Sequence, residues 1–225
     1  MIFFDIDGTL FDQENAEKLA AIHFFKENTT DLQLNPKEFI VLRDMYYNNY
    51  PIYAQKARSM QERNRMIMKD FFGHHISNEF ADQKAKDFLH LYKQNWIPFH
   101  DVISCLEQLK SQNYNLGIIS NGNYDRQIDK LDRLGVKNYF DVITICNQKG
   151  LTKPNKHIFL AACNEANIKP EQAYYIGDNL VYDAIASKHC GMNGIWLNRK
   201  NRTTYDDLNV IHSLDELINI INCTK

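Results

Sequence analysis

The sequence predicts an α/β protein in which an all-helical domain interrupts a parallel sheet after its first strand. The chain opens on the apolar run MIFF (residues 1–4), which is typical of a strand buried on both faces. After residue 98, strand-like and helix-like segments alternate, an order typical of a parallel sheet covered by helices. Residues 13–97 show only helical patterns. We therefore expect a Rossmann-like core made of residues 1–12 and 98–225, with a helical cap domain of residues 13–97 inserted into it.

Three helical stretches are expected in the insertion. The first covers residues 14–28, which begin with acidic side chains and continue with regularly spaced apolar ones. The second covers residues 35–72, from a capping asparagine followed by proline to a terminating glycine, with an interruption at Tyr50-Pro51. The third covers residues 77–96 and is closed by a proline.

Five parallel strands are expected in the core. Four strand-like segments follow the opening strand, and helical segments separate them from one another, so helices should cover both faces of the sheet. The later strands are predicted at residues 115–120, 141–145, 173–178 and 194–198, and the helices at residues 101–112, 123–134, 155–166, 180–189 and 213–222.

Two aspartates, Asp5 and Asp7, follow the first strand directly. In an extended chain, side chains two residues apart leave the backbone on the same face. Two carboxylates about 4 Å apart repel each other by roughly 4 kcal/mol at an effective dielectric constant of 20. Folding alone does not explain such a pair, whereas a bound cation or partial protonation would relieve the repulsion.

Other polar residues fall at the same edge of the predicted sheet. Ligands of open parallel sheets bind beyond the carboxyl ends of the strands, so residues at these ends are candidates for one site. Carboxylates gathered there would suit Mg²⁺, while a lysine, a hydroxyl group and amide groups would hold a phosphate dianion. The candidates after the first strand are Ser120, Asn121, Lys153, Asp178 and Asp183.

These residue types are suited to phosphoryl transfer. Asp5 is placed to attack phosphorus as a nucleophile, which divides one difficult transfer into two easier ones. Asp7 can protonate the leaving alcohol and later deprotonate the attacking water. These residues therefore suit a metal-assisted phosphoryl transfer with Asp5 as nucleophile and Asp7 as acid and base.

Four segments resemble, in order, the motifs of the haloacid dehalogenase (HAD) superfamily: DIDGTLF (5–11), IISNG (118–122), KPNKHIF (153–159) and GDNLVYD (177–183). The position of the insertion is similar to that of the helical-cap branch, which contains enzymes like phosphoglycolate phosphatase, β-phosphoglucomutase and 5′-nucleotidase. Tyr182 departs from the small polar residue frequent in such relatives.

The resemblance implies a magnesium-dependent phosphomonoester hydrolase that works through an aspartyl-phosphate intermediate, with a role for each matching residue. Asp5 would be the nucleophile and a magnesium ligand, and Asp7 the acid–base that also offers its backbone carbonyl to the metal. Asp178 would be a further magnesium ligand, and Asp183 would orient water bound to the metal without binding the metal itself. Phosphate would be bound by Ser120 and Lys153, with Asn121 as a further donor. Thr9 is open between a phosphate contact and a hydroxyl that only stabilises the turn.

The cap carries an aromatic stripe that could select the substrate. Arg43, Tyr46 and Tyr50 share one helical face, which would suit a nucleoside or another flat group. The other reading, which we favour, makes these side chains part of the core of the cap. The adjacent histidines His74 and His75 follow the terminating glycine and are expected at a solvated helix end, because no other ligand stands at metal-binding spacing.

Composition bears on the partners and the compartment. A net charge of −2 and a pI near 6.4 give no basic surface for a nucleic acid polymer. No apolar run is long enough to span a membrane. The five cysteines form no C-x-x-C pair and no secretory signal precedes the first strand, so we expect a cytoplasmic protein with a small phosphorylated molecule as its partner.

Two other functions stay open at this point. A phosphosugar mutase of the β-phosphoglucomutase type needs the same core with a cap that retains the intermediate. A phospho-accepting signalling module of the receiver type also combines acids, metal and lysine on a parallel sheet. A carbon–halogen hydrolase is disfavoured, because it has no use for Asp7 and Asp178. The substrate could be a nucleoside monophosphate or a sugar phosphate, and the sequence does not specify an oligomeric state.

Overall fold

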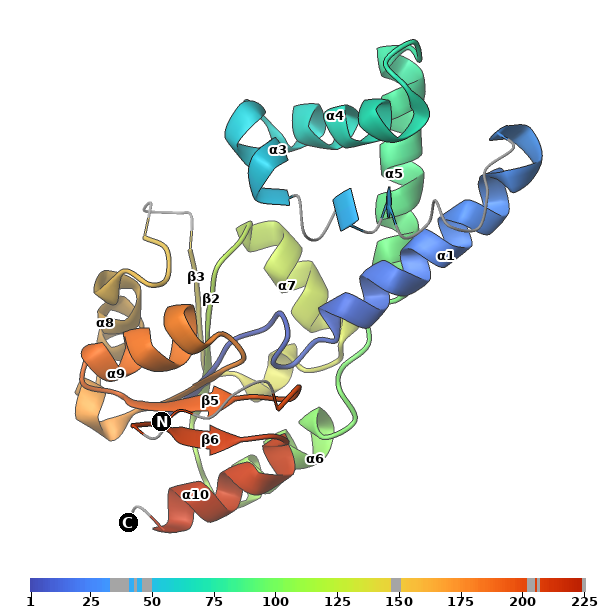
Figure 1. Ribbon diagram of the computed structural model, residues 1–225. Coiled ribbons are helices and arrows are strands. Elements are labelled where there is room, and N and C mark those ends of the chain that lie inside the picture. The colour runs from blue at the N-terminus through green and yellow to red at the C-terminus, as the bar shows by residue number, and fades with distance from the viewer. Residues whose placement is uncertain are drawn as a thin grey trace. The chain divides into compact units, whose positions relative to one another are not determined.

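The chain forms two compact units, which we describe separately. The computed structural model describes residues 1–32, 41–42, 44–45, 50–146, 151–201, 205 and 207–223. The first unit, the core unit, contains Met1–Asp12 and Ile97–Lys225, and the second, the helical unit, contains Gln13–Trp96 (Figure 1).

A six-stranded sheet forms the centre of the core unit. Its order is β3-β2-β1-β4-β5-β6, and every pairing is parallel. The first strand lies in the middle, with Ile2 opposite Leu116 on one side and Tyr174 on the other. The strands are β1 (Ile2–Phe4), β2 (Leu116–Ser120), β3 (Val142–Ile145), β4 (Tyr174–Gly177), β5 (Asn193–Leu197) and β6 (Asn209–Ile211).

The predicted fold class is confirmed, but the strand count of five was wrong. The additional strand is β6, which pairs with β5 at the edge of the sheet. It has three residues, and only Ile211 is buried. So short a segment shows no apolar pattern that would predict a strand, and its pairing is decided by the neighbouring strand.

Helices cover the sheet as predicted, with two local differences. The segment predicted as helix 180–189 begins as a π-helix, Leu180–Ile185, because the backbone N–H groups of both Asp183 and Ala184 donate to Asn179 O. The last helix begins with a 3₁₀ turn, Leu214–Glu216. The α-helices are α6 (Val102–Ser111), α7 (Tyr124–Arg133), α8 (Lys156–Glu165), α9 (Ala186–His189) and α10 (Leu217–Cys223).

One face of the sheet packs on α8 and α9. Phe3 and Tyr175 of the central strands are fully buried there against Phe159 and Ala186. The rings of Phe159 and Tyr175 meet edge to face with their centroids 5.2 Å apart. This packing brings Tyr175 beneath the carboxyl ends of the strands, where its hydroxyl group enters the site described below.

The helical unit contains α1 (Gln13–Leu32), α3 (Tyr50–Lys56), α4 (Met60–Phe72) and α5 (Asn78–Gln94). Gly73 ends α4 with a φ of 100°, as predicted, and α5 begins near the predicted Ser77, which caps it by accepting from Phe80 N. A helix, α3, begins at Tyr50, and the residues just before it lie outside the described ones, so the interruption expected at Tyr50-Pro51 stays a prediction. Proline is well tolerated in the first turn of a helix. The predicted start at Asn35 lies outside the described residues.

The core of the helical unit is aromatic and aliphatic. Phe24 meets Phe88 edge to face at 5.7 Å, beside the buried Ile67 and Met68. None of the described helices has an apolar stretch of the length required for a membrane span.

Candidate active site

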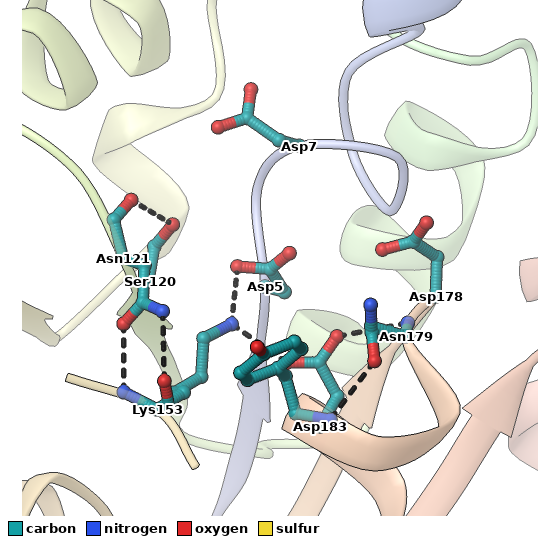
Figure 2. Close-up of a pocket in the computed structure, with 9 residues that line it drawn as sticks. Asp5, Asp7, Ser120, Asn121, Lys153, Asp178, Asn179 and Asp183 are labelled. Atoms are coloured by element: carbon teal, nitrogen blue, oxygen red, sulfur yellow. Dashed lines mark hydrogen bonds and ion pairs between the residues drawn. The ribbon is translucent and has the colours of Figure 1, made fainter. Parts of the chain in front are cut away.

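A hollow of about 190 Å³ opens at the carboxyl edge of the sheet in the core unit (Figure 2). It lies beyond the ends of β1, β2 and β4, where the sequence predicts a site. Its lining contains every catalytic and metal-binding candidate of the core unit. The lining residues are Asp5, Asp7, Ser120, Asn121, Lys153, Asp178, Asn179, Tyr182 and Asp183.

Three carboxylates gather at the base of the hollow. Asp5, Asp178 and Asp183 each place an oxygen within 4.8 Å of the others. Two glycines allow this approach. A Cβ atom at Gly8 would lie 2.4 Å from Asp178 Oδ2, and one at Gly177 would lie 2.4 Å from Asp183 Oδ2. Neither position could carry a side chain without moving a carboxylate.

Lys153 is the buried cation of this cluster. Its Nζ donates to Asp5 Oδ1 at 2.7 Å, to Asp183 Oδ1 at 2.7 Å and to Tyr175 Oη at 2.8 Å. An ammonium group has three N–H donors, so all three have protein acceptors. Burial opposes the charge, but the neighbouring Asp5 and Asp183 outweigh it and raise the pKa of Lys153 above its ordinary value.

The acids carry more negative charge than Lys153 offsets. Burial raises the pKa of Asp5 to about 6 despite the lysine. Asp178 faces solvent in part, yet the protein atoms around its carboxylate and the charges of Asp5 and Asp183 raise its pKa to about 7. A divalent cation among these oxygens would remove the excess charge, and carboxylate oxygens are the ligands that magnesium prefers. The residues present therefore fit such a metal.

Asp183 accepts hydrogen bonds from both the lysine and the backbone at the base of the hollow. Its Oδ1 accepts from Lys153, and its Oδ2 accepts from the backbone N–H of Asn179 at 3.0 Å. Tyr175 Oη lies 3.1 Å from Asp183 Oδ1 and 2.8 Å from the carbonyl oxygen of Ile119. Sequence analysis missed Tyr175, because nothing in a buried strand marks one tyrosine as facing an active site.

Asn121 bridges two loops. Its Nδ2 donates to Lys153 O at 3.1 Å, while its Oδ1 accepts from Lys153 N at 2.8 Å. Ser120 is buried at the end of β2, and its Oγ donates to Asn121 O at 3.2 Å. The Asn121 side chain thus fixes the position of the Lys153 backbone by hydrogen bonds to both its N–H and its carbonyl group.

The hydroxyl group of Thr9 is directed toward Asp178. Thr9 is fully buried, and its Oγ1 accepts from the backbone N–H of Asp178 at 3.1 Å. The residue does not line the hollow. In this structure, the hydroxyl links the turn after β1 to the end of β4.

Asp7 lies apart from the group around Lys153 (Figure 2). Its Oδ2 accepts from Gln127 Nε2 at 2.8 Å, and its Oδ1 pairs with Lys130 Nζ. Sequence analysis missed both partners. Their spacing of three residues on one face of a helix that directly follows the SNG segment is the signal that could have found them.

The aromatic stripe predicted in the cap falls outside the described residues. This holds for Arg43 and Tyr46, and for the side chain of Tyr50. The neighbouring Tyr53 is described, and it belongs to the core of the helical unit, where its Oη donates to Asp70 Oδ2 at 2.8 Å. His74 has an 81% exposed side chain 3.2 Å from Asp70, as expected for a solvated helix end.

Comparison with known proteins supports the resemblance seen in the motifs. A family described as haloacid dehalogenase-like hydrolase matches residues 2–197. A glyceraldehyde 3-phosphate phosphatase from Methanothermobacter thermautotrophicus is 29% identical over 198 residues, which cover 88% of this chain and 84% of the relative. The pyrimidine 5′-nucleotidase YjjG from Escherichia coli is 25% identical over 231 residues, 96% of each chain. An (S)-2-haloacid dehalogenase from a Pseudomonas species is 24% identical and covers 98% of this chain and 95% of the relative.

Solved structures show the same fold. The HAD-hydrolase YfnB from Bacillus subtilis superimposes with a TM-score of 0.75 at 21% identity, covering 98% of this chain and 97% of that one. Because the family match extends over most of the chain and includes all four motifs, this protein belongs to the haloacid dehalogenase-like hydrolases.

Proposed function

We propose that the protein is a magnesium-dependent phosphomonoester hydrolase that acts on a small phosphorylated metabolite through an aspartyl-phosphate intermediate. The observation that carries the proposal is the cluster of Asp5, Asp178 and Asp183 around a single buried lysine in one hollow. Relatives named as phosphatases of glyceraldehyde 3-phosphate and of pyrimidine nucleotides support the reaction class.

Magnesium would be held by the side chains of Asp5 and Asp178 and by the backbone carbonyl of Asp7. Asp183 would support them without binding directly, because both of its oxygens already accept hydrogen bonds. When bound, the metal would offset negative charge on the phosphoryl oxygens and on Asp5, so that the two anions can approach each other.

The first half of the reaction transfers the phosphoryl group to Asp5. A carboxylate oxygen of Asp5 forms a bond to phosphorus as the bond from phosphorus to the leaving oxygen breaks. Protonated Asp7 gives its proton to the leaving oxygen and becomes a carboxylate. Ser120 and Lys153 bind the phosphoryl oxygens during this transfer.

The second half returns the enzyme to its starting state. Asp7 takes a proton from a water molecule, whose oxygen bonds to phosphorus while the acyl-phosphate bond to Asp5 breaks. The products are inorganic phosphate and the free Asp5 carboxylate, and Asp7 is protonated again. One aspartate thus serves both steps, as acid and then as base.

Lys153 can reach a phosphoryl oxygen only by giving up one of its three acceptors. Asp5 and Asp183 are charged, whereas Tyr175 is a neutral hydroxyl group, and burial beside Asp183 raises the pKa of Tyr175 well above its ordinary value. Charge-assisted hydrogen bonds are the stronger ones. We therefore expect an incoming phosphoryl oxygen to replace Tyr175 as the third partner of Lys153.

The helical unit would act as the cap that selects the leaving group. The chain leaves the core unit after Asp12 and returns at Ile97, and these crossings are joined by a hydrogen bond from Asp12 N to Ile97 O at 3.4 Å. The contribution of Arg43, Tyr46 and Tyr50 to selection stays a prediction.

The mutase and the dehalogenase are the competing enzymes. A mutase shares the core and differs in the product. A dehalogenase would not need the acid–base Asp7 or a metal ligand at Asp178, although haloacid dehalogenases are among the relatives. A stoichiometric signalling module is disfavoured by membership of a hydrolase family.

The test is a panel of substrates. We expect the purified protein to release inorganic phosphate over many turnovers from glyceraldehyde 3-phosphate, from uridine 5′-monophosphate or from a sugar phosphate. Formation of an isomeric sugar phosphate without phosphate release would instead identify a mutase. Halide release from 2-chloropropionate, with no hydrolysis of any phosphate ester, would contradict the proposal.

A further inference from the structure

We propose that Gln127 and Lys130 of α7 are positioning residues that orient the Asp7 carboxylate for proton transfer to the leaving group. The inference rests on the proposed function, which makes Asp7 the acid–base. It goes further by assigning a task to α7, a helix that lies outside the four motifs.

Both side chains are buried and polar. Gln127 and Lys130 are each 2% exposed, although an amide and an ammonium group lose hydration when they are buried. Lys130 Nζ pairs with Asp7 Oδ1 and lies 4.7 Å from the ring centroid of Phe11, a residue of the same turn as Asp7. The ammonium group is therefore held between the carboxylate and the aromatic ring.

Gln127 connects Asp7 to the loop that would hold phosphate. Its Nε2 lies 2.8 Å from Asp7 Oδ2, 2.9 Å from Asn121 O and 3.2 Å from Ser120 Oγ. With Lys130 on one oxygen and Gln127 on the other, the plane and the position of the Asp7 carboxylate are both fixed. The side chain of Asp7 is still 29% exposed and lines the hollow, so one side is open to a substrate.

This arrangement separates two demands on the acid–base. Gln127 and Lys130 fix the position of the Asp7 carboxylate, and the shape of the hollow determines which leaving group the carboxylate contacts. Proton transfer by a positioned side chain contributes roughly 10²–10⁴-fold to a rate, and that contribution depends on geometry. It is needed when the leaving group is a basic alkoxide, and hardly at all when a nitrophenolate leaves.

The experiment compares two esters in variants of α7. Lys130→Met and Gln127→Met remove the donors while keeping side chains of similar length. We measure kcat/KM for p-nitrophenyl phosphate and for the best alkyl phosphate of the panel. We expect the value for the alkyl ester to fall at least about tenfold and that for the nitrophenyl ester to change less than about threefold.

Two controls accompany the variants. Lys137→Met removes an exposed ion pair between Lys137, which follows α7, and Asp132 of α7, whose charged atoms are 2.9 Å apart, and should leave both values unchanged. Lys130→Arg keeps a cation beside Asp7 and should restore part of the loss on the alkyl ester. Melting temperatures show whether each variant is folded, and if Lys130→Met does not fold, the neutral Gln127→Met provides the same comparison.

The outcomes are distinct. A selective loss on the alkyl ester supports the inference. Equal losses on both esters, or unchanged values on both, overturn it and leave α7 with a packing role while phosphatase activity stands. If the unaltered protein hydrolyses neither ester, the proposed function fails and this inference fails with it.

Discussion

At the scale of single residues, each carboxylate of the site depends on a different neighbour. Asp5 is held by Lys153, Asp183 by Lys153 and a backbone N–H group, and Asp7 by two side chains of α7. The carboxylate of Asp178 lies directly over Gly8, where a side chain would displace it. The same residue type thus has four environments, which is what different chemical tasks require.

Replacement of Asp5, the proposed nucleophile, should abolish turnover. Asp5→Asn keeps the size of the side chain but removes the nucleophilic carboxylate, so phosphate release should fall by a factor on the order of 10³–10⁶, as for other covalent catalysts. Mass spectrometry excludes deamidation back to aspartate, and an unchanged melting temperature excludes misfolding. Residual activity of a few per cent in a sample free of aspartate at this position would contradict the covalent mechanism.

Gly8 offers a test of the close approach to Asp178. Gly8→Ala should lose most activity, because its φ of 79° is unfavourable for alanine and its Cβ would meet the Asp178 carboxylate. Gly135→Ala is the matched control, since Gly135 has a φ of 71° but no atom within 4 Å of an added Cβ. We expect both variants to lose about 1–2 kcal/mol of unfolding free energy for the left-handed backbone. Only Gly8→Ala should also require more magnesium for half-maximal activity, and equal magnesium requirements would refute this account.

At the scale of elements, a buried ion pair joins the start of α6 to the segments after β5 and β6. Arg199 donates to both oxygens of Asp101 at 2.7 and 2.9 Å and to Thr9 O at 3.0 Å. Asp101 Oδ2 also accepts from Ser213 Oγ and Leu214 N, each at 2.8 Å. Arg199 therefore joins the turn that follows β1 to the start of α6 and to the segment after β5.

Removal of the charge on Asp101 should destabilise the core unit. Burial opposes ionisation, but Arg199 and the backbone of Leu214 outweigh it and hold the pKa of Asp101 below its ordinary value. Because the folded pKa is lowered, the stabilisation is complete above the unfolded pKa of about 4 and is lost as the pH falls below it. Asp101→Asn should therefore lower the unfolding free energy by about 2–4 kcal/mol at pH 7 and by less at pH 3, as measured by urea denaturation.

The control for this prediction is an exposed pair. Asp132→Asn breaks the ion pair with Lys137, in which the Asp132 side chain is 53% exposed, and should cost less than about 1 kcal/mol. A cost for Asp101→Asn as small as that of the control, or one that stays constant down to pH 3, would show that the buried pair does not stabilise the fold.

At the scale of the whole molecule, the polypeptide is divided into two units, and the hollow belongs to one of them. All residues that line the hollow belong to the core unit. The two segments that connect the core unit to the helical unit lie beside the turn of Asp7, because Phe11 forms isolated β-bridges with both Asp7 and Pro98. Under the proposed function, we expect substitutions in the helical unit to alter substrate choice while the core chemistry stays the same.

Removal of metal should act on the molecule as a whole. Chelation with EDTA should stop phosphate release, and magnesium should restore it. Since a ligand of the native state stabilises folding, magnesium at 100 times its Kd should add about 2.7 kcal/mol, seen as a higher melting temperature. Asp178→Asn should lose this thermal shift. Full activity in a metal-stripped sample, or the same shift in the variant, would refute the assignment of the metal site.

The sequence by itself determined the fold class, the family and the edge of the sheet at which the site lies. These rest on local signals: a buried strand that ends in Asp5 and Asp7, a lysine before proline, and further acids after a later strand. Parallel strands bring such ends together whatever the details of packing, so the order of the segments was sufficient. Capping residues and apolar periodicity are local signals as well, so the predicted ends of most core helices agree with those observed.

Only the tertiary structure decided which side chain meets which. Lys153 bonds to Asp5 across 148 positions, and Lys130 pairs with Asp7 across 123. The hydroxyl of Tyr175 reaches the site only because its ring is packed beneath the strand ends, and β6 exists only because β5 offers it an edge. Contacts between residues so far apart depend on how helices and strands pack, and periodicity within a segment carries no information about them.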